Sequence, residues 1–151
     1  MKRFVLVTVI LVSIAAVSAA AAAELVRKES SHSVKETIDR LEAAVKERGL
    51  SVVVRVDHAA AAKKANLELR PTELIIFGSA AVGTPLIQAE QTMGLSLPIK
   101  ALAWQDPQGK VWLGYDTPAS VAADRGVPRD HSVIGKMDAT LKTLAEAATK
   151  K

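Results

Sequence analysis

The sequence predicts an α+β fold: a single domain with a mixed or antiparallel sheet, covered by two long amphipathic helices and by shorter helices. Residues 33–48 and 131–148 place apolar side chains at helical spacing, and short apolar runs lie between them. Two of these runs flank residues 106–109, Asp-Pro-Gln-Gly, whose proline and glycine favour a tight turn. Strands joined by a tight turn pair antiparallel, so a purely parallel sheet is not expected.

The first 23 residues have the three parts of a secretory signal peptide. Lys2 and Arg3 supply a positive start, residues 4–17 form an apolar run, and residues 18–23 are small, with alanines in an A-x-A register. The run is shorter than the roughly 20 residues that span a bilayer, although an uncleaved anchor stays an alternative. We therefore predict a signal peptide over residues 1–23, a single domain after it, a periplasmic or secreted location, and no stable membrane span after cleavage.

Composition narrows the chemistry of the domain, residues 24–151. The chain has no cysteine, which excludes disulfides, thiolate nucleophiles and cysteine-ligated metals. Its net charge of +4 includes Lys2 and Arg3 of the signal peptide, so the mature domain is close to neutral. A near-neutral domain gives no reason to expect nucleic acid as a partner.

The first predicted elements are a strand over residues 24–30 and a helix over residues 33–48. Ser33 with Glu36 forms a capping box at the helix start, and Gly49 suits a left-handed residue at its end. Four apolar residues mark the buried face of this helix: Val34, Ile38, Leu41 and Val45.

Residues 50–57 read as a strand, and the alanine-rich residues 58–65 as a short helix that ends at a left-handed Asn66. Residues 67–69 suit a short edge strand. Residues 74–77 are continuously apolar, which is typical of a strand covered on both faces. In the first of these strands the alternation places three valines on one face: Val52, Val54 and Val56.

The second half is predicted to begin with a loop of small residues over 78–83. The elements that follow are a helix over 84–93 with Pro85 near its start, hairpin strands over 99–105 and 110–115, a short helix over 118–125, and the final helix over 131–148.

Trp104 and Trp112 lie on the two hairpin strands. We expect them in the core, because large aromatics dominate core burial, with a pocket or a dimer surface as the alternatives. Pairing of Gln105 with Lys110 would place Trp104 opposite Val111.

Residues 78–84 have the glycine spacing of a phosphate-binding loop, after a buried strand and before a helix. Such a loop needs Lys directly after the second glycine, but Thr84 holds that place and Pro85 follows it, so nucleotide binding is not expected. The amides near Gly83 and Thr84 suit a small anion at a helix N-terminus. The alternative is a tight strand-to-helix connection that needs small residues.

Asp57 and His58 lie where a strand runs into a helix. His58 suits ligand binding or acid–base chemistry, and the alternative is a hydrogen-bonded histidine at an element junction. His32 and His131 lie near helix starts, where we expect local caps. No two histidines have metal-ligand spacing, so we predict no metal site.

An ordered series of motifs over about residues 30–147 resembles the domain-of-unknown-function family 302. Its members are Gly49-Leu50, Val52–His58, Leu67-Glu68-Leu69, Pro71–Leu74, Phe77-Gly78, Gly83–Leu86, Leu97-Pro98, Ala103-Trp104 and Gly109–Trp112. The resemblance implies a compact α+β fold and a homodimer, and it implies no established reaction. Ser79-Ala80 replace the Asn-Pro that usually follows Gly78.

These observations favour an exported, non-catalytic envelope protein that binds a partner or a small anionic ligand, without a cofactor. The ligand-binding residues are predicted to be His58, Gly78, Gly83, Thr84 and Pro85. The alternative is an enzyme that uses His58 as general base with Asp57 or Glu90 nearby. Sequence leaves open whether His58 and the glycine segment converge in space.

Overall fold

A computed structural model describes residues 24–151 of the protein; the predicted signal peptide lies outside the described residues. All neighbouring strands of the five-stranded sheet are antiparallel, in the order β1-β5-β4-β3-β2, which confirms the predicted fold class. The strands are β1 (Leu25–Ser30), β2 (Ser51–Asp57), β3 (Thr72–Gly78), β4 (Ile99–Gln105) and β5 (Val111–Asp116).

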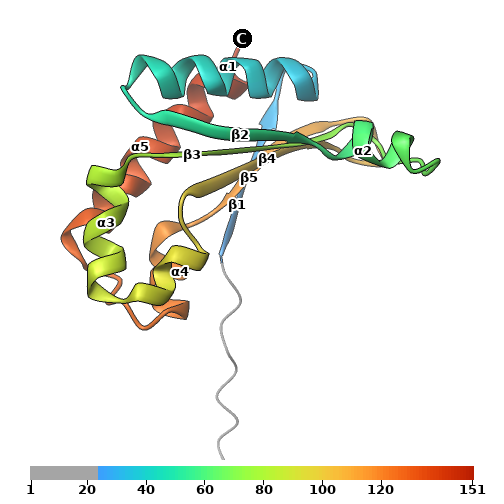
Figure 1. Cartoon of the computed structure of the whole chain (residues 1–151). Helices are drawn as coiled ribbons and strands as arrows, with labels where there is room; N and C mark the ends of the chain where they lie inside the picture. Colours follow the sequence, from blue (N-terminus) through green and yellow to red (C-terminus); the bar gives the residue numbers. More distant parts are fainter. Residues whose placement is uncertain (1–23) are drawn as a thin grey trace, which may run out of the picture.

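The two long helices lie on one side of this sheet, and the shorter ones lie at its ends. Figure 1 shows α1 and α5 over the same face, α3 and α4 beyond one end of the strands, and α2 at the opposite end. The helices are α1 (Val34–Glu47), α2 (His58–Lys64), α3 (Ala80–Ala89), the 3-10 helix η1 (Gln91–Leu95), α4 (Pro118–Asp124) and α5 (Ser132–Thr149).

The main core lies between the sheet and α1 with α5. Burial alternates along β3, where Ile75 and Phe77 face the helices and are almost fully buried. Ile38 and Leu41 of α1 and Leu144 of α5 pack against this face. A second, smaller core joins α3, η1, α4 and the start of α5 through Leu86, Met93, Ala122, Val127, Ile134 and Met137.

The predicted helix ends in the first half are confirmed. Ser33 accepts a hydrogen bond from the backbone N–H of Glu36 at the start of α1. The reciprocal half of the predicted capping box is not formed, because the Glu36 carboxylate contacts the His32 ring. Gly49 after α1 and Asn66 after α2 both have positive φ, which glycine and asparagine adopt at the least steric cost.

A bulge in β2 changes which valines share a face. Val52 pairs with Phe77 and Val54 with Ile76, so Val53 is an extra residue. As a result Val52 faces the helices with Arg55, whereas Val54 and Val56 face the other side. The prediction that Val52, Val54 and Val56 share one face was therefore wrong, because strict alternation does not continue through a bulge.

Two other predicted elements are corrected. Residues 67–69 form no strand. The segment 78–83 is not a loop: α3 begins at Ala80 and ends at Ala89, and η1 follows it. The alanines after Ser79 favour helix strongly enough to start it early, so Pro85 lies in the helix interior.

Candidate functional site

His58 is the first residue of α2 and is exposed. The carboxylate of Asp57 accepts a hydrogen bond of 2.8 Å from the backbone N–H of Ala60, so it caps the helix. In the part of the chain that the structure describes, no hydrogen bond to the His58 ring is present. The pair thus has the geometry of a helix start, and Asp57 does not orient the imidazole.

Most of the glycine-containing segment 78–84 belongs to α3. Gly83 and Thr84 lie inside the helix beside Pro85, and the Gly83 N–H donates to the Ser79 carbonyl at 2.9 Å. These positions therefore do not form a helix N-terminus for an anion. Gly78 ends β3, where an added Cβ would lie 3.3 Å from Cβ of Pro98.

The structure does not bring the two halves of the predicted site together. In the β2–β3 pairing, Gly78 lies opposite Ser51, whereas Asp57, next to His58, lies opposite Glu73. At about 3.3 Å per residue these ends are roughly 20 Å apart. Figure 1 shows α2 and α3 at opposite ends of the molecule.

The remaining candidate residues are Glu90 and two histidines. Glu90 lies after α3, far from α2, and hydrogen bonds from the N–H and hydroxyl of Thr92 hold the pKa of its carboxyl below the usual value. The His131 ring accepts from the N–H of Val133 at 3.4 Å and caps α5. The prediction that His32 is a local cap was wrong, because Ser33 caps α1. The His32 ring instead lies 3.0 Å from Glu36 Oε1 and 2.8 Å from the Lys150 carbonyl, so it connects α1 to the end of α5.

Residues 24–151 contain no group of three or more His, Asp or Glu side chains arranged to hold a metal ion. In the same range no helix has the length and hydropathy needed to cross a bilayer.

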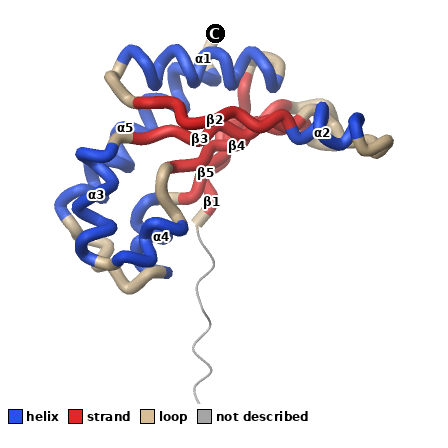
Figure 2. Tube along the Cα trace, viewed as in Figure 1, coloured by secondary structure: helices blue, strands red, loops and turns tan. Residues whose placement is uncertain are grey.

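The sheet has an apolar outer face, on the side away from α1 and α5. Figure 2 shows the strands with that side bare of long helices. We call it the open face; its apolar residues are Leu25, Val54, Val56, Leu74, Ile76, Leu102, Trp104 and Trp112. Leu25 is 52% exposed and Val54 41% exposed.

Both tryptophans lie on the open face, whereas the sequence predicted them in the core. Gln105 pairs with Val111, so Trp104 lies directly opposite Trp112. The predicted pairing of Gln105 with Lys110 was therefore off by one residue. The Trp112 indole N–H donates to Asp106 at 2.8 Å, which lowers the pKa of that carboxyl. Trp104 lines a shallow groove of about 350 Å³ together with Leu25, Leu69, Arg70, Thr72, Leu102, Gln105 and Gly114.

The sequence of this domain matches a known protein family. The model of the family described as "Domain of unknown function DUF302" matches residues 26–148. The chain belongs to this family. The DUF302 assignment confirms the resemblance drawn from the motifs.

A solved DUF302 structure shows the same fold. The crystal structure of the uncharacterized conserved protein DUF302 from Bacillus stearothermophilus superposes with a TM-score of 0.74 at 18% identity, over 82% of this chain and 97% of that one. At this identity the likeness supports the fold alone.

Curated relatives carry the DUF302 sequence within longer chains. "Fluoride-specific ion channel FluC 1" of Brucella suis and that of Brucella abortus are each 50% identical to this chain over 120 residues. The match covers 80% of this chain, but only 45% and 42% of those two proteins. The DUF302 chain thus spans less than half the length of the curated relatives it matches.

Proposed function

We propose that this DUF302 protein is an exported envelope domain that works by binding a partner, and that the partner on its open face is a second copy of the chain. The observation that carries the proposal is the apolar character of that face, with Leu74, Ile76, Leu102 and Trp104 on the two central strands.

An antiparallel sheet with one solvated face usually alternates apolar residues inside with polar residues outside. Strand β3 departs from this rule, because Leu74 and Ile76 point outward and alternate with the buried Ile75 and Phe77. A continuous apolar run of this kind predicts a strand covered on both faces. Helices α1 and α5 supply one cover, and we infer that the second comes from another molecule.

A second copy fits this face by shape and by charge. Two twisted sheets pack face to face at about −30°, so an apolar sheet face is complementary to itself. The exposed charges on the outer side of β1 are Arg27 and Glu29, two residues apart and of opposite sign. Glu29 also pairs with Lys110 at 3.2 Å. In a two-fold interface each copy presents both signs of charge to the other.

The oligomeric state of purified residues 24–151 tests this proposal. Light scattering after size exclusion should give the mass of a dimer at about 100 µM, a concentration that populates complexes of micromolar Kd. Val54→Glu and Leu25→Glu place charges on exposed positions of the open face and should give monomers with unchanged circular dichroism.

Ala43→Glu is the matched control, because Ala43 is exposed on α1, across the sheet from the open face. This variant should stay dimeric. A monomeric unmodified chain, or a dimer that survives both open-face substitutions, would contradict the proposal.

Export is proposed on the signal-peptide pattern of residues 1–23. The strands and helices described above lie within residues 25–149, so cleavage after Ala23 keeps them. Expression of the full chain in a bacterium should yield periplasmic protein whose mass begins at Glu24. Recovery of the full-length mass from the cytosol would reject this part.

The curated relatives suggest a second candidate partner, a membrane channel. The matched segment is less than half of each relative, and residues 24–151 contain no helix able to span a bilayer. We infer that the fluoride conduction named for those proteins resides in their remaining length. Removal of the matched segment from the Brucella suis relative should leave fluoride efflux from liposomes in place, and loss of efflux would overturn the inference.

A further inference from the structure

We infer a second binding site in this chain: a cavity at the end of the sheet that fits a free α-amino acid with an apolar side chain. The cavity has a volume of about 170 Å³ and lies where the sheet splits. β3 pairs with β4 as far as Ile99, and β1 pairs with β5 as far as Asp116, but the β4–β5 pairing stops at Leu102 and Gly114. The first residues of β4 and the last of β5 are therefore free of each other, and Figure 2 shows the strands fanning apart toward this end.

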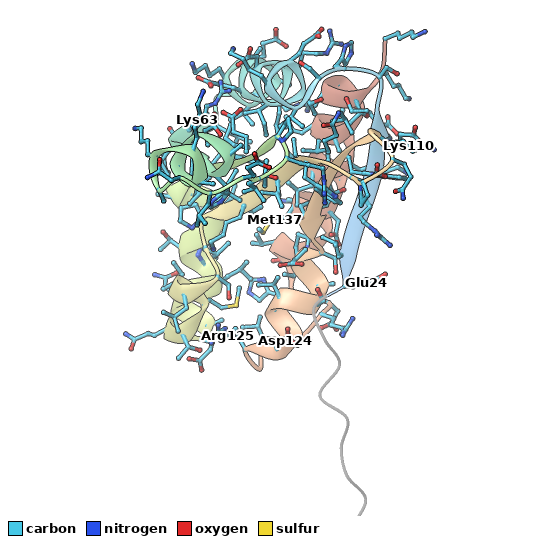
Figure 3. The ribbon with its side chains drawn as sticks, turned by 90° about the vertical axis from the view of Figure 1, so that its right-hand side faces the viewer. Glu24, Lys63, Lys110, Asp124, Arg125 and Met137 are labelled. Carbon is cyan, nitrogen blue, oxygen red and sulfur yellow. The ribbon has the colours of Figure 1, made fainter. Side chains whose placement is uncertain are left out.

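One side of the cavity is apolar. The lining residues Leu95, Leu97, Ile99 and Val121 keep accessible surface there, whereas Leu86, Met93 and Met137 are almost fully buried, at 0%, 1% and 5% exposure. Figure 3 shows Met137 in the middle of the molecule, with Arg125 below it. An apolar cavity of about 150 Å³ holds a benzene-sized group, so this interior accommodates the side chain of leucine, methionine or phenylalanine.

The rim carries two opposite charges from the two separated strands. Lys100 lies on β4 and Asp116 at the end of β5, and both line the cavity. Within residues 24–151 neither charge belongs to an ion pair, and the Lys100 ammonium makes a long contact of 3.3 Å with the Ser96 carbonyl. Arg125 donates to the Ser96 hydroxyl at 3.2 Å, which adds a second cation on the Lys100 side.

This arrangement matches a zwitterion. A carboxylate is attracted to Lys100 and the Ser96–Arg125 side, an ammonium group is attracted to Asp116, and the apolar side chain enters between the strands. A ligand with only one charge leaves one charge of the rim without an opposite charge. Glycine has no side chain to fill the apolar side of the cavity. The site is formed within one chain, but Lys100 pairs with Ile76 and Asp116 with Leu25, so its rim borders the open face.

Titration calorimetry on residues 24–151 with L-leucine, L-methionine and L-phenylalanine tests the inference. At least one should bind, and about tenfold tighter than glycine and than two analogues of leucine, 4-methylpentanoate without the ammonium and 3-methylbutylamine without the carboxylate. Absence of binding by all three at about 10 mM would overturn the inference, as would equal affinity for 4-methylpentanoate.

Substitutions at the rim locate the site. Lys100→Met and Asp116→Asn should each weaken binding about tenfold while melting temperature is retained. Lys142→Met and Asp130→Asn, at exposed positions elsewhere, serve as matched controls and should bind as the unmodified chain does. Unchanged affinity in both rim variants would show that the ligand binds elsewhere. Val54→Glu, separated from Lys100 by Ile76 of β3, should still bind the same amino acid as a monomer, which separates this result from the test of the dimer.

Discussion

The indole of Trp104 lies directly on Gly114 of the neighbouring strand. A Cβ added at Gly114 would lie 2.9 Å from Cζ3 of Trp104 and 3.1 Å from the carbonyl oxygen of Val26 on β1. The missing side chain thus lets an aromatic ring and a third strand approach the same backbone. The ring covers the middle of the sheet, and the open face depends on this contact for its shape.

Gly114→Ala should therefore destabilise the protein. The added methyl group must move the Trp104 ring or the β1 backbone, and overpacking of this kind costs about 1–3 kcal/mol. Urea unfolding gives the free energy, and tryptophan emission should shift because the chain has two tryptophans and both lie on this face. Gly135→Ala is the control: an exposed glycine in α5 with no atom within 4 Å of an added Cβ. This change should stabilise the helix by about 0.5–1 kcal/mol. Equal effects of the two substitutions would contradict the proposed contact.

Arg55 and Glu73 form the best-protected ion pair between β2 and β3. The Arg55 Nε lies 2.8 Å from Glu73 Oε1, and the Glu73 residue is 8% exposed. Arg55→Met should cost about 2 kcal/mol, because it leaves a buried carboxylate without its partner. The double variant Arg55→Met with Glu73→Leu should regain most of that loss in urea unfolding, since the buried carboxylate is then absent. Asp39 and Glu42, which Arg55 also contacts, keep their lysine partners on α1. A double variant as unstable as the sum of the two single variants would refute this coupling.

Asp138 on α5 should reduce stability at neutral pH. Burial raises the pKa of its carboxyl above the ordinary value, and the negative charge of Glu24 adds to the effect. The folded chain therefore holds the proton to higher pH than the unfolded chain. Stability is lost as pH rises from the ordinary aspartate pKa of about 3.9 through the raised folded pKa.

Asp138→Asn removes this loss, so it should raise the free energy of unfolding at pH 7 and have no such effect below the ordinary aspartate pKa. A second measurement uses Tyr115, the one tyrosine of the chain, whose pKa is raised by burial first and then by the charges of Asp138 and Glu146. Titration of phenolate absorbance should show a lower Tyr115 pKa in the variant. An unchanged Tyr115 titration would argue against the Asp138 charge acting there.

Substitutions of Asp57 and His58 should differ in their effect on the free energy of unfolding. Asp57→Ala removes the cap of α2 and should cost about 1 kcal/mol. His58→Ala changes an exposed side chain and should stay within about 0.5 kcal/mol of the unmodified chain. Thermal unfolding compares the two, and a larger loss for His58→Ala would assign its ring a structural contact.

Sequence reasoning was reliable where a local signal is strong. Ser33, Gly49 and Asn66 mark helix ends through their own backbone or side-chain chemistry, and the structure places each as expected. It failed at Val53, because a bulge depends on how two strands pair and leaves no mark in the alternation of one strand. It also failed at residues 78–83, where the glycine spacing suggested a loop but alanines extended the helix.

The family, the α+β class, the order of the elements and the antiparallel hairpin could be predicted from sequence, because periodicity, caps and turn residues act over a few neighbouring positions. Three further features emerged only in the folded chain: His58 and Gly78 lie at opposite ends of a strand pair, Trp104 faces outward, and β4 and β5 separate beyond Leu102 and Gly114. These facts depend on strand register and on which face the helices cover. A one-residue change in register moves every side chain to the other face, so no single segment contains that information.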